Sequence, residues 1–186
     1  MSKKKELEVE LKKENDKRKN SNKVGANFEM RIQKILDELR EEGVCYISKI
    51  PTEFTILRRG SKIISAFPKA QSRFLDYVGI INGKFITIEA KTCGSSKTSY
   101  PLSGFKDYQL PLLEDFLEYG AMGYVAIEMR ELSKTFLIEG NKFLETVKGL
   151  NRKSIPIELL EEIGIEVGED LQGLKTFIKA LTNDNK

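Results

Sequence analysis

The chain has 186 residues, of which 40% are hydrophobic and 32% charged, a balance that fits one soluble globular domain with its own core. Its net charge of +3 is too small to indicate nucleic acid by itself, and its apolar runs, such as Phe136 to Ile138, are far shorter than the ~20 residues of a membrane helix. The absence of His excludes serine-histidine triads, His-ligated zinc and His-based nucleases, so any chemistry must come from carboxylates, Lys, Tyr, Cys or a metal held by oxygen.

Two features of the sequence bear on its cellular compartment. The cysteines, Cys45 and Cys93, are too few for a disulfide framework, and no signal-peptide pattern opens the chain. We therefore expect a cytoplasmic protein without membrane segments. Cys93 lies two residues after Lys91, but it has no His to activate it, and we interpret it as a small packing residue.

Basic residues crowd the first two dozen positions, whereas the stretch from Glu158 to Asp170 is strongly acidic. Residues 1–23 are nearly all charged or amide-bearing, which predicts a flexible basic arm or a frayed helix before a single folded domain over residues 24–186. Such an arm can meet DNA phosphates, and a solvated charged helix is the alternative interpretation. The basic residues of the arm are Lys3, Lys4, Lys5, Lys12, Lys13, Lys17, Arg18, Lys19 and Lys23.

The first predicted elements of the folded part are a helix and a projecting hairpin. Apolar residues recur at helical spacing from Phe28 to Leu39, which indicates an amphipathic helix. Two β-prone stretches follow at residues 44–50 and 52–57, and a basic turn then leads into another strand at 63–67. This pattern predicts a basic β-hairpin stalk over about residues 54–70. Its predicted turn residues are Arg58, Arg59, Gly60, Ser61 and Lys62.

A second hairpin follows the stalk. Residues 75–81 and 85–90 are β-prone, and Asn82-Gly83 between them is a strong signal for a two-residue hairpin turn. The remaining predicted elements are a polar loop at 94–99, a helix over 110–117 with Pro111 in its first turn, strands at 124–129 and 135–139, a short helix from Asn141, and helices at 158–163 and 171–181. This order implies an α/β fold with a mixed central sheet flanked by helices.

The second hairpin also predicts a cluster of charged residues. Counting outward from a two-residue turn at Asn82-Gly83 puts Asp76 directly opposite Glu89, and alternation along the strand puts Lys91 on the same face. Directly opposed carboxylates, with Cβ atoms ~4.5–5.5 Å apart, repel each other. Water, a proton on one carboxyl, or a divalent cation must compensate this repulsion. Magnesium suits hard oxygen ligands of this kind.

A solvated surface hairpin is the alternative interpretation of these charges. Most strands that carry an acidic and a basic residue two positions apart do so on a wet face. Here, however, hydrophobic residues flank the charges on both strands, which favours a strand in the interior of the sheet. Charged groups are costly to bury there without a partner or ligand, so the pattern favours a functional site.

The order of an acidic residue, a hairpin and Glu-x-Lys resembles the core of the PD-(D/E)xK nucleases. More narrowly, six segments in this order and at similar separations resemble RecU, the Holliday junction resolvase family of Gram-positive bacteria and some of their phages. The similarity covers about Val24 to Glu139, most of the predicted domain. The segments are Gly25 to Glu29, Lys49 to Thr52, Asp76 to Ile80, Glu89 to Thr92, Tyr100 to Leu102, and Tyr108 with Gln109.

The resemblance implies a restriction-endonuclease-like core and a magnesium-dependent endodeoxyribonuclease that resolves Holliday junctions in DNA recombination and repair. Asp76 and Glu89 would ligate Mg²⁺, with Mn²⁺ as a substitute, and Lys91 would orient or activate the attacking water. Glu29 would approach from the first helix, and Gln109 would line the same pocket. For these last two, the alternatives are a surface glutamate and an ordinary polar residue in a first helical turn.

The resemblance also implies branched DNA as the partner and a symmetric homodimer, because two strands of a junction are cut and each chain has one candidate metal site. We expect residues 44–57 and the first helix at the dimer interface. The stalk would enter the junction centre, although a solvated basic turn is the alternative. Phe74 and Tyr108 depart from the family, which commonly has Thr and His there. The implied DNA-binding residues are Arg58, Arg59, Lys62, Lys69 and Arg73.

Two other functions remain open from the sequence. A different PD-(D/E)xK nuclease, such as an end-processing or restriction-type enzyme, would carry the same triplet, because the triplet does not determine the shape of the substrate. A non-catalytic DNA-binding recombination accessory factor is the other alternative. The joint presence of Asp76, Glu89 and Lys91 argues against that second alternative, and no residue identifies a recombinase partner.

Overall fold

A six-stranded sheet in the order β1-β4-β5-β7-β8-β10 forms the centre of the fold, with β5 and β7 parallel and the other neighbours antiparallel. The predicted α/β fold with a mixed sheet is thus confirmed.

The computed structural model describes residues 25–69, 71–96 and 98–183, so the predicted arm at 1–23 lies outside it. The elements after the first helix (25–41) are β1 Tyr46–Lys49, β2 Phe54–Arg59, β3 Lys62–Pro68, β4 Tyr77–Ile81, β5 Lys84–Cys93, β6 Ser99–Pro101, η1 Leu102–Gly104, α2 Gln109–Glu118, β7 Met122–Met129, η2 Arg130–Leu132, β8 Lys134–Glu139, α3 Gly140–Gly149, β9 Ser154–Pro156, α4 Ile157–Ile163, β10 Gly164–Glu166 and α5 Gln172–Asn183.

Helices cover both faces of the central sheet. The first helix and α5 pack on one face, where Leu36 and Leu174 belong to the same buried cluster. Helices α2, α3 and α4 pack on the other face, around Leu113 and Phe143. The apolar periodicities that predict these helices therefore correspond to the sides that are buried. In the described part of the chain, no helix combines the length and apolar character needed to cross a membrane.

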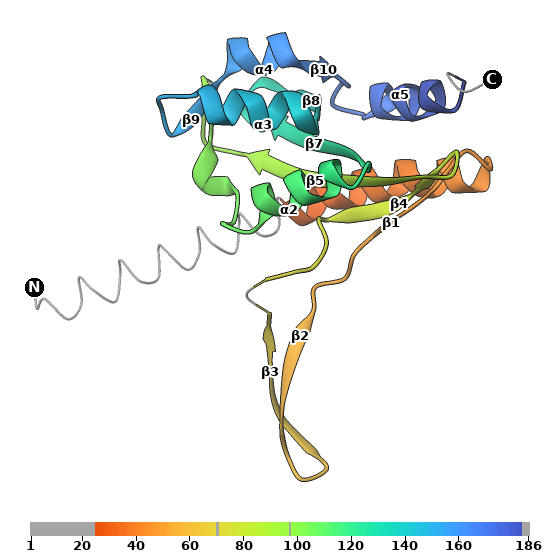
Figure 1. Cartoon of the computed structure of the whole chain (residues 1–186), viewed down its shortest axis with the longest axis vertical. Helices are drawn as coiled ribbons and strands as arrows, with labels where there is room; N and C mark the ends of the chain where they lie inside the picture. The colour runs from red at the N-terminus through yellow and green to blue at the C-terminus, as the bar shows by residue number, and fades with distance from the viewer. Residues whose placement is uncertain (1–24, 70, 97, 184–186) are drawn as a thin grey trace, which may run out of the picture.

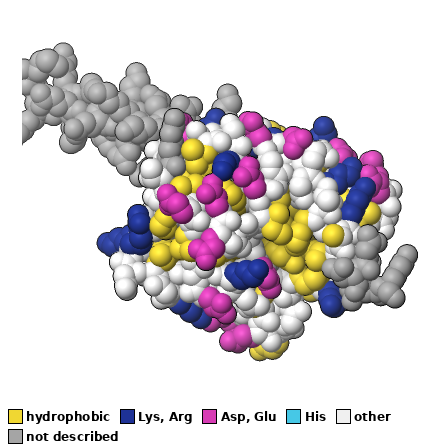
Figure 2. Space-filling view, turned by 90° about the horizontal axis from the view of Figure 1, so that it is seen from above, with side chains coloured by type: hydrophobic (Ala, Val, Ile, Leu, Met, Phe, Trp, Pro, Cys, Tyr) yellow, Lys and Arg dark blue, Asp and Glu magenta, His cyan; other side chains and the backbone are white. Residues whose placement is uncertain are grey.

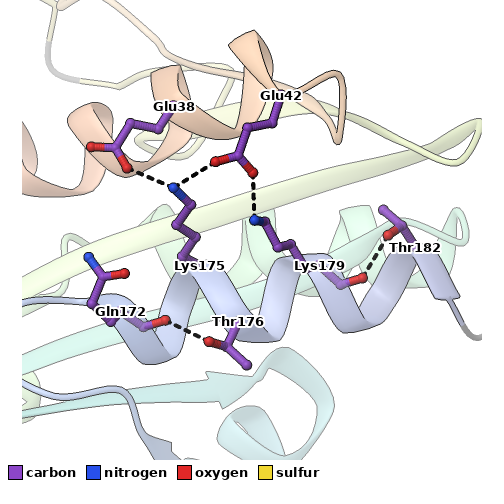
Figure 3. A network of polar contacts seen from close by, with 7 residues as sticks. All are labelled: Glu38, Glu42, Gln172, Lys175, Thr176, Lys179 and Thr182. Carbon is purple, nitrogen blue, oxygen red and sulfur yellow. Dashed lines mark hydrogen bonds and ion pairs between the residues drawn. The ribbon is translucent and has the colours of Figure 1, made fainter.

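Ion pairs join α5 to the first helix (Figure 3). Lys175 Nζ lies 2.9 Å from Glu38 Oε2 and 2.8 Å from Glu42 Oε1, and Lys179 Nζ lies 2.6 Å from Glu42 Oε2. Hydrogen bonding to Lys175 is the main cause that lowers the pKa of both carboxyls. The last described helix is thereby held on the helix that carries the candidate residue Glu29.

The predicted stalk is a separate two-stranded sheet of β2 and β3 that projects from the body of the molecule (Figure 1). Its turn is shorter than predicted, since Arg58 and Arg59 end β2 and Lys62 begins β3. Gly60, at φ +62°, allows the chain to reverse in two residues. Nearly all stalk side chains are exposed, the hydrophobic ones included. The stalk therefore adds little to the core and presents its side chains to solvent.

Three short strands, β6, β9 and β10, were not predicted from the sequence. The segment 94–99, predicted as a polar loop, ends at the start of β6, which pairs with β9 outside the central sheet. Strand β10 pairs with β8 and extends the central sheet by one strand. Each of these strands has only three residues, which is too short for the alternation of polar and apolar side chains that reveals a strand in a sequence.

Candidate active site

The β4–β5 hairpin places the two candidate metal ligands side by side. Asn82 and Gly83 adopt φ +49° and +73°, as a two-residue hairpin turn requires, and the ladder has the predicted register along the whole of β4. Asp76 immediately precedes β4, so the same count sets it beside Glu89. Asp76 Oδ2 also accepts a hydrogen bond from the backbone N–H of Ala90 at 2.9 Å. The hairpin register predicted from the sequence is therefore confirmed.

The strand that carries Glu89 lies inside the sheet, between β4 and β7. Only 1% of the Glu89 surface is exposed, so the interpretation as a solvated surface hairpin is wrong. On the other side of β4, a Cβ at Gly79 would come within 2.0 Å of the Tyr46 carbonyl oxygen on β1. Only glycine permits this close approach of the two strands, which completes the sheet around the site.

Glu89 has one partnered and one unpartnered carboxylate oxygen. Its Oε1 lies 2.6 Å from Lys91 Nζ and accepts a hydrogen bond from Gln109 Nε2 at 2.5 Å. Its Oε2 is buried and has no hydrogen-bond partner among the described residues. Burial, and then the charge of Asp76, raise the pKa of Glu89 to about 8 against the opposing effect of Lys91. A proton or a cation is therefore needed at this carboxylate near neutral pH.

Gln109 and Phe105 hold the ammonium group of Lys91. Gln109 begins α2 and is buried, and its Oε1 accepts hydrogen bonds from Lys91 Nζ and from the backbone N–H of Lys106, both at 2.9 Å. The Lys91 ammonium also lies 5.2 Å from the centre of the Phe105 ring, within the range of a cation–π contact. Because Gln109 contacts both Glu89 and Lys91, one amide bridges the two candidate catalytic side chains.

The donor set at this site fits a magnesium ion. Glu89 offers an unpartnered buried oxygen, and the adjacent Asp76 supplies a second carboxylate. Within the described residues, no group of three or more His, Cys, Asp and Glu side chains could hold a metal, so protein carboxylates alone would not fill a coordination shell. Magnesium suits such a site because it keeps several waters and binds through one or two carboxylates together with a substrate phosphate.

Glu29, the remaining candidate catalytic residue, lies apart from this hydrogen-bonded group. Its carboxylate pairs with Lys49 on β1, and its backbone carbonyl accepts a hydrogen bond from Tyr77 Oη at 2.7 Å. Burial, with smaller contributions from the charges of Glu29 and Asp76, raises the pKa of Tyr77. The described contacts thus bring Asp76, Glu89, Lys91 and Gln109 together, whereas Glu29 is linked to this region through Tyr77, the neighbour of Asp76, and through Lys49.

The predicted DNA-binding residues occupy two different settings. The three basic residues at the stalk tip are exposed. Lys69, at the stalk base, forms an ion pair with Glu53 at 2.5 Å, so its charge is already partnered, and Arg73 is exposed nearby. A cavity of about 90 Å³ lies between the stalk base and the start of α2, and its walls include Asp76 and Gln109. The stalk base therefore borders the candidate active site.

Sequence reasoning misses two residues of the site. Phe105 lies against Lys91, and Lys106 donates its backbone N–H to Gln109. Both precede α2 in an irregular segment without helical or strand periodicity. Their nearness in the sequence to Gln109 is the only signal that could have indicated them.

Comparisons with known proteins identify the family of the chain. The family model described as "Recombination protein U" (RecU) matches residues 23–183. The chain is 30% identical over 148 residues to the Holliday junction resolvase RecU of Geobacillus sp., covering 75% of this chain and 73% of that protein. It is also 30% identical over 169 residues to the protein of the same name from Pediococcus pentosaceus, covering 86% and 83%. A solved structure of the Holliday junction resolvase Hjc from Archaeoglobus fulgidus superposes with a TM-score of 0.45 at 18% identity, over 78% of this chain and 98% of that one. The chain belongs to the RecU family.

Proposed function

We propose that this chain is a structure-specific endodeoxyribonuclease that resolves Holliday junctions by magnesium-dependent hydrolysis of phosphodiester bonds, on a restriction-endonuclease-like core. The observation that carries the proposal is the unpartnered Oε2 of buried Glu89 beside Asp76, with Lys91 held next to Glu89. Family membership and the names of the relatives support the junction as the substrate. A decayed site in an accessory factor would have no reason to keep so costly a buried carboxylate.

Each residue of the site has a separate role in this proposal. Asp76 and Glu89 would hold the magnesium ion, and the bound ion would supply an acidified water and positive charge for the phosphoryl oxygens. Lys91 contacts a phosphate oxygen or the attacking water through an ammonium group that Phe105 and Gln109 hold in place. Gln109 donates a hydrogen bond to Glu89 Oε1, which leaves Oε2 as the oxygen that would bind the ion.

The distribution of charge supports DNA contact on the stalk side. Arg58, Arg59 and Lys62 present three exposed cations at the stalk tip, where they contact phosphates at the junction centre. On the opposite side of the molecule, acidic and basic side chains are interspersed among apolar ones over the described residues (Figure 2). That side offers phosphates no uniform attraction, so we assign the junction to the stalk side.

Resolution also requires two cuts, and each chain supplies one candidate site, so the proposal includes a symmetric homodimer. We place its interface at β1 and the first helix. Strand β1 is an edge of the central sheet, and Tyr46 and its ladder partner Ile80 are both more than half exposed. Sedimentation at micromolar concentration tests the dimer. A monomer that makes both cuts would disprove it.

The decisive experiment compares cleavage of a four-way junction with that of a linear duplex of the same sequence, with and without Mg²⁺. We expect Mg²⁺-dependent cuts in the junction alone. Asp76→Ala should abolish these cuts while junction binding persists, because the carboxylate holds the ion rather than the DNA. Equal cleavage of the linear duplex would favour another PD-(D/E)xK nuclease. Binding without cleavage at any divalent ion would favour the accessory factor.

A further inference from the structure

Two aromatic side chains line the cavity beside Asp76. Phe74 lies two residues before Asp76, and Tyr108 immediately precedes Gln109, so each aromatic is within two positions of a residue of the candidate site. Phe74 is 39% exposed, and Tyr108 is half-buried.

Phe74 is supported from behind by two further rings. It stacks on Phe116 of α2 with the ring centroids 6.3 Å apart and the planes inclined by 16°. Phe116 in turn lies 5.4 Å from Phe85 of β5, the strand that carries Glu89 and Lys91. A Phe held in this way loses little rotamer freedom when a second ring stacks on it, unlike a free surface Phe. The partly exposed ring is therefore a preorganised apolar surface beside the site.

The cavity lining also contains a second ring and a cation. The ammonium of Lys106 lies 5.8 Å from the centre of the Tyr108 ring, and Lys106 itself lines the cavity. The cavity thus combines aromatic rings and an ammonium group with the carboxylate of Asp76, a candidate metal ligand. A nucleotide whose base has left the duplex stack matches the rings and the ammonium group, because its base can stack on an aromatic ring while its phosphate meets the cation.

We infer that Phe74, with Tyr108 lining the same cavity, forms a stacking site for an unstacked base next to the phosphodiester that is cut. This inference rests on the proposed function and adds a reason for junction specificity. In a linear duplex the bases are stacked on each other, whereas the strands at a branch point can release a base at lower cost. We place the base against the exposed part of the Phe74 ring, at the edge of the cavity.

The inference is tested by removing the ring and the base separately and together. The wild type first locates the cut, and abasic sites are then placed at the nucleotides on either side of it. Base–aromatic stacking is worth ~1–3 kcal/mol, so we expect Phe74→Ala to weaken junction binding in Ca²⁺ by about 5- to 150-fold. An abasic site at the stacked position should weaken wild-type binding by a similar factor and leave the Phe74→Ala variant unaffected.

Three control variants separate stacking from packing and folding. Phe74→Tyr keeps the ring and should bind as the wild type does, whereas Phe74→Leu keeps an apolar side chain without a ring and should bind like Phe74→Ala. Tyr119→Ala removes a 92% exposed ring at the end of α2, outside the cavity, and should have no effect. The inference is overturned if the effects of Phe74→Ala and of the abasic sites on binding are additive. It is also overturned if Phe74→Leu binds the junction as the wild type does. Loss of wild-type cleavage would instead overturn the proposed function, whereas junction binding in Ca²⁺ by the Phe74→Ala, Phe74→Tyr and Phe74→Leu variants still tests the inference, because that comparison does not require the position of the cut.

Discussion

Replacing Glu89 with Gln should stabilise the metal-free protein while it abolishes cleavage. Glu89 is buried, its Oε2 has no described partner, and its pKa is raised to about 8 from an ordinary value of 4.5. Between these two pH values the folded protein holds a proton that the unfolded chain releases. Stability must therefore fall as the pH rises through this range, and it stops falling above the pKa of the folded state. A neutral amide of the same shape removes this dependence.

The size of the effect follows from the number of protons involved. Release of one proton changes the free energy of unfolding by at most ~1.4 kcal/mol per pH unit. Between pH 5.5 and 7.5 the free energy of unfolding of the wild type should therefore fall by roughly 2–3 kcal/mol relative to that of the Glu89→Gln variant. That is a large part of the ~5–15 kcal/mol by which a domain is usually stable. The chain contains no His, the residue type whose ordinary pKa lies in this range, so the background slope should be small.

Denaturant unfolding in EDTA at pH 5.5, 6.5 and 7.5 measures the difference, and Glu118→Gln, which neutralises an exposed carboxylate, is the matched control. Mg²⁺ should stabilise the wild type more at pH 7.5 than at pH 5.5, because it competes with the proton for the same carboxylate. The reasoning is refuted if Glu89→Gln and Glu118→Gln follow the same pH dependence. A Glu89→Gln variant that still cuts junctions would refute the metal assignment.

Three further predictions concern the positioning amide, the sheet and the arm. Gln109→Ala should lower the cleavage rate about 10- to 100-fold with little loss of junction binding, because Lys91 and Glu89 lose the amide that bridges them. Gln172→Ala, at the start of α5, is the control, and an unchanged single-turnover rate of the Gln109→Ala variant would contradict the bridging role. Gly79→Ala should reduce the free energy of unfolding by about 1–3 kcal/mol, because the added Cβ would meet β1. Gly149→Ala is the control, because a Cβ there would meet nothing within 4 Å. Equal unfolding midpoints of the two variants would contradict the close approach of β4 and β1. Deleting residues 1–22 should flatten the salt dependence of junction binding, since each lost phosphate contact reduces the slope by about 0.9, and an identical slope would remove the arm from the interface.

The sequence alone determined the parts of the site that depend on local geometry. The Asn82-Gly83 turn admits one hairpin register, and that register puts Asp76 beside Glu89 whatever surrounds the hairpin. The amphipathic helices were predictable for a similar reason, because their periodicity reflects which side must be buried. The short strands β6, β9 and β10 were not, since three residues carry no periodic signal and form strands only when a partner is present.

Only the tertiary structure decided how the charged residues are used. Glu89 becomes a costly buried carboxylate because β7 and α2, both later in the chain, pack around β5. The same packing brings Gln109 to both Glu89 and Lys91 and sets Phe116 behind Phe74. Desolvation and side-chain contacts depend on which distant segments meet. The residue types therefore indicated the chemistry, whereas the protonation of Glu89 and the placement of the aromatic rings followed from packing.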